Sequence, residues 1–308
     1  MKLIRHLSGA ANLPAQRCIL ALGAFDGVHI GHQMLIREMK TRANQLSRPT
    51  AVLSFEPLPR EYFRQPGFLR LTRIREKLVL LANMGIDFTL LAKFNQDFTQ
   101  LNPEQFIDLM VKKLAPEEIW VGADFRFGHQ RAGSVATLEA NAARYGYRCV
   151  VVGDVLHDQA RVSASAIRAL LIQGNVPDAN AKLARCFSYS GRVVQGQQLA
   201  RTLGFPTANL LWLDAPTALY GVYAVRVYGK GFKSVPAVAS LGMRPVVQGS
   251  ACWLEVHLFD FDGDLYGQRL RVDFIKKLRP EQNFDGLAAL VAQVNIDITQ
   301  AKAALDEL

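Results

Sequence analysis

The sequence predicts two domains: an α/β domain with a parallel sheet, then a small antiparallel β-barrel with a closing helix. Three observations support this fold class. The chain has 308 residues, of which 50% are hydrophobic, enough for two cores. In residues 1–180, short β-branched runs alternate with helical patterns, whereas after Leu183 closely spaced strands are separated by Gly- and Pro-containing turns. We expect the domains to span residues 1–184 and 185–308.

Strands and helices alternate in the first domain. A helix is expected to start after Asn102, because Pro103 suits the first helical position and Gln105 can complete a capping box. Its apolar residues recur at helical spacing to Leu114. This alternation predicts βαβ units and therefore a parallel sheet. The expected strands are 18–22, 50–55, 88–91, 119–121 and 148–152.

The second domain has the pattern of a barrel, with strands expected at 189–194, 222–228, 235–241, 253–259 and 270–275. A final stretch has the spacing of an amphipathic helix, which predicts a helix that packs over the barrel. The apolar residues of that stretch are Leu287, Leu290, Val291, Val294 and Ile298.

The composition excludes some functions and favours others. The net charge of +9 and a pI of about 9.5 predict an anionic partner. The basic residues are scattered among acids, which favours anionic metabolites over nucleic acid. Four cysteines without a CxxC pair indicate reduced thiols. Since no apolar stretch approaches the roughly 18 residues that span a bilayer, we expect a cytoplasmic protein without a membrane partner.

A loop with the features of a phosphate site follows the first expected strand. Glycines would let the backbone approach a triphosphate, and the next helix would direct free N–H groups and its positive dipole end towards it. His29 and His32 could donate hydrogen bonds to the α-phosphate as charge builds up. A plain glycine turn is the alternative, and a zinc site lacks further ligands at usual spacing. The predicted nucleotide contacts are Gly23, Phe25, Asp26, Gly27 and Gly31.

Two later segments allow both a functional and a structural interpretation. Ser163 could be a plain helix N-cap, or it could bind phosphate together with Ser165 and Arg168. The segment 121–133 could be an aromatic loop packed on the sheet edge. Its Asp, Arg and aromatic residues also suit a planar ring that carries a ribose or phosphate.

Together these elements resemble the adenylyltransferase domain of the bacterial bifunctional riboflavin kinase/FMN adenylyltransferase (FAD synthetase) family. The C-terminal half carries further motifs in the order of that family's riboflavin kinase barrel, and the resemblance covers nearly the whole chain. These motifs are Gly191-Arg192-Val193-Val194, Gly204-Phe205-Pro206-Thr207-Ala208-Asn209, Gly221-Val222-Tyr223, Leu254-Glu255-Val256-His257 and Asp264-Leu265-Tyr266-Gly267.

The resemblance implies a Rossmann-like nucleotidyltransferase domain that converts FMN and ATP into FAD and pyrophosphate. It also implies a barrel that phosphorylates riboflavin with ATP to give FMN, and both steps would use Mg²⁺. The partners would be these small molecules, with no nucleic acid; no oligomeric state is indicated. The implied roles are Glu255 as the base, Thr207 and Asn209 at the metal, Gly204 and Pro206 at the nucleotide, and Asp124, Arg126, Phe127 and Arg279 at the flavin.

Strand alternation agrees with the role of Glu255, because Leu254, Val256 and Leu258 would share one face while Trp253, Glu255 and His257 share the other. A solvated outer face is the alternative for Glu255. The sequence departs from the family pattern at positions that could change affinity or loop closure. These positions are Ala164, Ala166, Gln197, Ala200 and Val246.

Two other functions are consistent with parts of the sequence. The loop that contains His29-Ile30-Gly31-His32 also suits nucleotidyl transfer to a different acceptor, although the barrel motifs argue against this. A basic nucleic-acid-binding protein with the same fold would show strongly salt-dependent binding.

Overall fold

The computed structural model describes residues 1–5, 17–65, 68–196, 200, 203–212, 219–246 and 249–306; Gln197 and the side chain of Val246 lie outside the described part. Contacts divide the chain into two compact units, Met1–Ala164 and Ser165–Leu308. Each unit is described by itself. The expected functional boundary between residues 184 and 185 stays a prediction.

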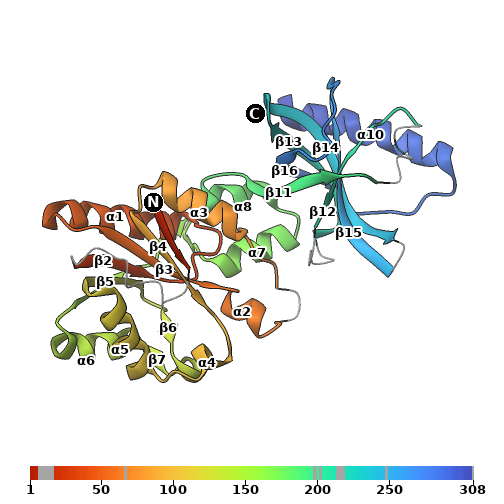
Figure 1. The fold of residues 1–308 in the computed structure, drawn as a ribbon. Coiled ribbons are helices and arrows are strands. Elements are labelled where there is room, and N and C mark those ends of the chain that lie inside the picture. The colour runs from red at the N-terminus through yellow and green to blue at the C-terminus, as the bar shows by residue number, and fades with distance from the viewer. Residues whose placement is uncertain are drawn as a thin grey trace. The chain divides into compact units, whose positions relative to one another are not determined.

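The first unit contains a six-stranded sheet in which every pairing is parallel, in the order β1-β4-β3-β2-β5-β8 (Figure 1). The parallel sheet and all five expected strands are confirmed. A sixth strand, β1, was not predicted, because a four-residue segment is too short to show a pattern. The strands are β1 (Lys2–Arg5), β2 (Cys18–Leu22), β3 (Thr50–Glu56), β4 (Phe88–Lys93), β5 (Pro116–Gly122) and β8 (Arg148–Val152).

Helices cover both faces of this sheet (Figure 1). α1 (Ile30–Leu46) and α3 (Ile74–Asn83) pack with Ile19, Ala21 and Val52 on one face. α5 (Pro103–Leu114) and α6 (Val135–Tyr145) pack on the opposite face. The sheet is therefore buried on both sides, which explains its nearly continuous apolar strands.

The predicted capping box of α5 is confirmed. The backbone N–H of Gln105 donates to Asn102 Oδ1 and the backbone N–H of Asn102 donates to Gln105 Oε1, both at 2.9 Å. Two N–H groups that would otherwise lack helical partners are thus paired.

The strand order reverses between β2 and β5. β3, β4 and β1 extend to one side of β2, whereas β5 and β8 lie on the other. Loops that leave the carboxyl ends of β2 and β5 consequently diverge, and open α/β sheets bind ligands at such a point. The remaining short elements of this unit are α2 (Pro59–Tyr62), α4 (Gln96–Thr99), β6 (Arg126–Phe127), η2 (His129–Arg131), β7 (Gly133–Ser134), β9 (Leu156–His157) and β10 (Ala160–Arg161).

The second unit is a closed antiparallel barrel in the order β11-β12-β15-β14-β13-β16, as predicted. β12 was not predicted, since its residues form part of the GFPTAN motif. Two helices, α7 (Ala164–Ile172) and α8 (Val176–Leu183), precede the barrel, and α8 packs on β11 and β16. The strands are β11 (Phe187–Val194), β12 (Ala208–Leu211), β13 (Gly221–Gly229), β14 (Phe232–Val246), β15 (Gly249–Leu258) and β16 (Arg269–Arg279).

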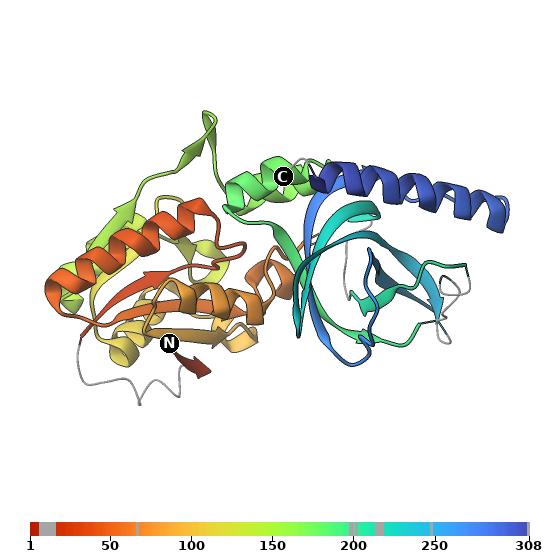
Figure 2. The same ribbon diagram turned by 90° about the horizontal axis from the view of Figure 1, so that it is seen from above.

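The closing helix α10 (Leu287–Asp306) is confirmed, and Figure 2 shows it along one side of the barrel. The prediction of which α10 residues pack against the barrel was partly wrong. Leu287 is 55% exposed, while Ala301, Ala304 and Leu305 pack against β13 and β14. Small alanine side chains let the helix approach the strands closely, and a search for large apolar residues overlooks them.

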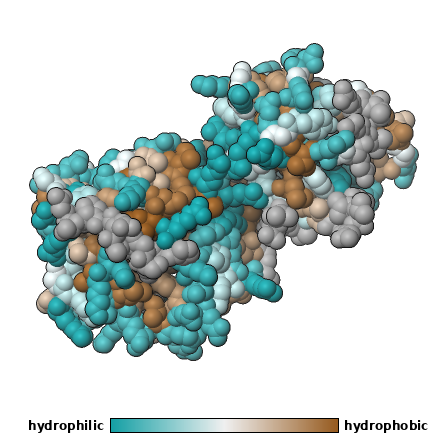
Figure 3. Space-filling model, in the orientation of Figure 1, coloured by the Kyte–Doolittle hydropathy of each residue, from teal (hydrophilic) through white to brown (hydrophobic). Residues whose placement is uncertain are grey.

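The described ranges contain no helix long and apolar enough to cross a membrane. Figure 3 shows hydrophilic residues over much of the visible face of each unit, with apolar residues in separate patches.

The α5 cap provides a stability prediction. Asn102→Ala should destabilise this helix by about 1 kcal/mol, which is roughly a fivefold increase in hydrogen-exchange rates of its amides. Hydrogen-exchange mass spectrometry of peptides from 103–114 measures this change. Glu104→Ala, at an exposed position of the same helical turn, is the control, and equal exchange in both variants would contradict a stabilising cap.

Candidate active sites

The loop between β2 and α1 is compact because several of its residues have left-handed backbone conformations. Phe25, Gly27 and Val28 have φ values of 47°, 83° and 41°. Gly23 leaves room for the buried Phe25 ring, since a Cβ at Gly23 would lie 3.1 Å from it. The Phe25 side chain therefore belongs to the core, and a nucleotide contact by this residue would involve its backbone.

The structure brings the two predicted histidines together at the start of α1. The rings of His29 and His32 are stacked with centroids 3.8 Å apart and an interplanar angle of 19°. Gly31 makes this possible, because a Cβ there would lie 3.2 Å from His29 Nδ1. The first turn of α1 contains no acidic residue, so the positive end of the helix dipole is not neutralised locally.

The surroundings of His32 favour its neutral form. Burial, then the charges of His29 and Lys77, hold the pKa of His32 well below its ordinary 6.5. Within the described residues, His32 Nδ1 is buried without a hydrogen-bond partner. A neutral imidazole keeps one N–H donor, so this side chain can donate a hydrogen bond to a phosphate oxygen.

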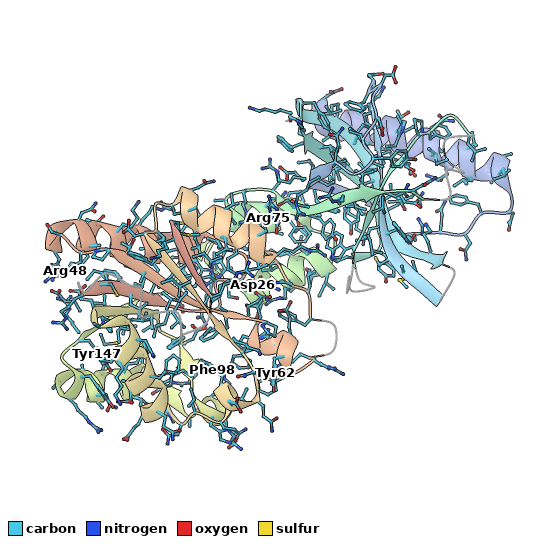
Figure 4. The ribbon with its side chains drawn as sticks, in the orientation of Figure 1. Asp26, Arg48, Tyr62, Arg75, Phe98 and Tyr147 are labelled. Atoms are coloured by element: carbon cyan, nitrogen blue, oxygen red, sulfur yellow. The ribbon has the colours of Figure 1, made fainter. Side chains whose placement is uncertain are left out.

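Asp26, predicted as a nucleotide contact, has a structural role in this arrangement. It is 3% exposed, and its Oδ1 accepts hydrogen bonds from the backbone N–H groups of Leu71 at 3.1 Å and Thr72 at 3.0 Å. Figure 4 labels Asp26 near the sheet edge where the first loop lies. Its carboxylate fixes the segment before α3 beside the loop, and its contact with nucleotide stays a prediction.

Buried charged side chains next to this loop were not predicted from the sequence. Lys77 of α3 is fully buried, and its Nζ donates to the carbonyl oxygen of Ala24 at 2.7 Å. Arg70 Nη1 donates to Glu56 Oε1 at 2.9 Å. A sequence signal existed for Lys77, because it lies four residues before buried Leu81 on the same helical face.

The residues expected at the flavin in segment 121–133 do not converge. Phe127 is 6% exposed, and its ring contacts Phe106 and Phe125 at centroid distances of 5.1 and 5.6 Å. This favours the packed-loop interpretation for Phe127. Asp124 is at the surface and pairs with Arg161 at 2.8 Å, and Arg126 is exposed. Their flavin contacts stay predictions.

An aromatic cluster near α2 was not predicted. Its rings lie 5.2–6.0 Å apart and come from segments far apart in sequence, so no local motif indicated them. One member, Phe63, is 61% exposed, which leaves an aromatic surface available to a planar ligand. Figure 4 labels two of its members, Tyr62 and Phe98. The full cluster is Phe55, Tyr62, Phe63, Phe94 and Phe98.

The predicted phosphate segment 163–168 spans both units. Ser163 directly precedes α7 and belongs to the first unit, whereas Ser165 and Arg168 belong to the second. α7 ends at Ile172, and Gly174 two residues later has a left-handed φ of +81°. Phosphate contacts by Ser163, Ser165 and Arg168 stay predictions.

In the barrel, the predicted base and metal residues lie on neighbouring strands. Glu255 of β15 is directly opposite Asn209 of β12 on one side and Ser240 of β14 on the other. Leu254 and Val256 are fully buried, so this polar row occupies the opposite face, as alternation predicted.

A guanidinium that was not predicted connects this row to a second carboxylate. Arg244 Nη2 lies 3.2 Å from Ser240 Oγ and 3.3 Å from Glu255 Oε2, while Nη1 lies 2.8 Å from Glu281 Oε1. Gly242 leaves room for this arrangement, because a Cβ at this position would displace the Glu281 carboxylate. Arg244 thereby orients Glu255.

The GFPTAN segment is held against β15. Pro206 O lies 2.9 Å from His257 Nδ1, and Gly204 has a φ of +88°. Asn209 Nδ2 donates to Thr207 O at 3.4 Å, which leaves the Asn209 side-chain oxygen and the Thr207 hydroxyl as hard oxygen donors. Since Mg²⁺ takes few protein ligands and binds mainly water and phosphate, these residues fit a Mg–ATP complex.

Arg279, the fourth expected flavin contact, forms an ion pair with α10. Its Nε and Nη2 donate to the two carboxylate oxygens of Asp297 on α10 at 2.8 and 2.7 Å. Asp297 is 3% exposed. The pair fastens α10 to the end of β16, and a flavin contact by Arg279 stays a prediction.

Comparisons with known proteins match both halves of the chain. Residues 12–166 match the family model for FAD synthetase, and residues 183–305 match that for riboflavin kinase. Proteins named bifunctional riboflavin kinase/FMN adenylyltransferase are 41% identical in Escherichia coli (98% of this chain, 97% of the relative) and 39% identical in Haemophilus influenzae (98% and 99%). A Streptococcus pneumoniae structure titled macrolide-efflux protein has a TM-score of 0.83 at 28% identity, covering 97% of this chain and 98% of its own. This chain therefore belongs to the bifunctional riboflavin kinase/FMN adenylyltransferase family.

Proposed function

We propose that this protein makes FAD from riboflavin in two ATP-dependent steps, with residues 185–308 forming FMN and residues 1–184 adenylylating it. The observation that carries the proposal is the presence of two separate polar constellations: the stacked histidines on α1 and the Asn209–Glu255 row of the barrel. Four free cysteines, two of them buried, support a cytoplasmic location.

In the kinase step, the ribityl hydroxyl oxygen of riboflavin attacks the γ-phosphorus of ATP, and the bond to the β-phosphate oxygen breaks to release ADP. Glu255 accepts the hydroxyl proton. Arg244 holds one Glu255 oxygen and leaves the other for that proton. Mg²⁺, when bound, would neutralise phosphate charge, with Thr207 and Asn209 as its protein ligands.

In the second step, a phosphate oxygen of FMN attacks the α-phosphorus of ATP and pyrophosphate leaves. The attacking oxygen is already anionic, so no protein base is required. His29 and His32 donate hydrogen bonds to the α-phosphate as its negative charge increases, assisted by the N-terminus of α1. The aromatic cluster that contains Phe63 offers a stacking surface for the flavin ring.

Separate sites predict separable activities. His32→Ala should lower FAD formation about 100-fold or more and leave FMN formation intact, whereas Glu255→Ala should lower FMN formation by about 100-fold or more and leave FAD formation from added FMN intact. Chromatography of flavins after incubation with ATP and Mg²⁺ measures both products. His157→Ala and Glu139→Ala serve as matched controls. Equal loss of both activities in either active-site variant would refute the assignment.

The Arg244 contacts predict a positioning effect. Arg244→Met should lower kcat for FMN formation about tenfold or more with a smaller change in the KM for riboflavin, because Glu255 loses its orientation. Gly242→Ala should act similarly by displacing Glu281. Steady-state kinetics test this, with FAD formation from added FMN as the control. A change confined to KM would contradict orientation of the base.

A further inference from the structure

The side chain of Lys77 on α3 contacts the loop between β2 and α1 from the interior of the first unit. Its Nζ donates to Ala24 O at 2.7 Å and to Ser54 Oγ at 3.2 Å. Ser54 Oγ itself donates to Ala24 O at 3.0 Å. These contacts join α3, β3 and the loop at one point. Because Lys77 is 0% exposed, its charge acts on the loop with little screening by water.

Holding the loop with an ammonium is energetically costly. Ala24 O also accepts a hydrogen bond from Ser54, so an unbranched apolar side chain at position 77 would leave this carbonyl paired and would remove only its connection to α3. Burial of an ammonium is unfavourable, and it lowers the pKa of Lys77 from 10.5 to about 8. The folded state therefore retains a charge at neutral pH that opposes folding, and the apolar alternative would avoid this cost.

Charged groups surround Lys77 on several elements. Asp26 from the loop, Glu56 from β3 and Glu61 from α2 favour its charged form, while Arg70 and burial oppose it. Lys77 in turn is one of the charges that keep His32 neutral. The ammonium of Lys77 therefore lies among three carboxylates and one guanidinium, on the buried side of the loop that carries the histidines.

We propose that Lys77 is a positioning residue of the adenylyltransferase site, whose buried ammonium holds the Ala24 carbonyl and so fixes the loop that carries His29 and His32 against α3 and β3. This inference rests on the proposed nucleotide site at His29 and His32.

The test is the pH dependence of FAD formation from FMN and Mg–ATP by the full chain, measured from about pH 6.5 to about pH 9.5. Wild-type kcat/KM for ATP should fall above about pH 8, where Lys77 loses its proton. The thiols of buried Cys18 and half-buried Cys149 have pKa values raised by desolvation to about 12 and about 11, so they do not titrate in this range.

Three variants test whether Lys77 causes the fall of kcat/KM at high pH, which is called the alkaline limb below. Lys77→Met should lower kcat/KM for ATP at pH 7 about tenfold or more and remove the limb, while FMN formation by the same molecules stays at the wild-type level. Lys77→Arg should retain activity and move the limb to higher pH, because a guanidinium stays charged. Lys112→Met, at an exposed site on α5, should match wild type.

The outcomes separate the two proposals. If wild type forms no FAD, the proposed function fails. If wild type forms FAD but Lys77→Met keeps the wild-type kcat/KM and alkaline limb, the inference about Lys77 alone is wrong. The wild-type pH profile is a test that does not depend on whether the variants fold. A wild-type kcat/KM for ATP that stays constant through pH 8 would also overturn the inference.

Discussion

The loop between β2 and α1 depends on buried polar groups that hold it to neighbouring segments of the first unit. Phe25 and Val28 have left-handed conformations, which cost about 1–2 kcal/mol each for residues with a side chain. The Asp26 carboxylate and the Lys77 ammonium compensate by fastening the loop to the segment before α3 and to α3 itself. Without these contacts the loop would relax, and the first turn of α1 would no longer present two stacked imidazoles.

In the barrel, strand register holds the candidate site residues in position. Asn209, Glu255 and Ser240 lie opposite one another on three consecutive strands, and backbone ladders hold their positions without any special loop. Only the side-chain rotamers remain to be fixed. Arg244 does this for Glu255, and the absence of a side chain at Gly242 leaves room for Glu281 on the other side of the guanidinium.

Most strands were predictable because their β-branched runs are bounded by turn residues, and α5 because its cap is local. The histidines and Glu255 could be named as candidates because they lie in contiguous motifs. The contacts of Lys77 and Glu281 were missed because their partners Ala24 and Arg244 are 53 and 37 residues away; the spacing of Lys77 from Leu81 indicates its burial but not its partner. Burial of Phe127 and close packing of Ala301 likewise depend on neighbours that only the folded chain supplies.

The charges at each site agree with the nucleophile that the site must use. FMN brings an anionic phosphate, so a carboxylate close to the α-phosphate would repel it; the first turn of α1 has no acidic residue, and the nearest carboxylate of the loop, Asp26, is turned inward to backbone N–H groups. Riboflavin brings a neutral hydroxyl, which becomes a strong nucleophile only as it loses its proton. A carboxylate is therefore needed in the barrel, and Glu255 occupies the polar row beside the residues that fit Mg–ATP. The two units thus differ in whether a carboxylate lies among the candidate catalytic side chains, which agrees with this difference in substrate charge.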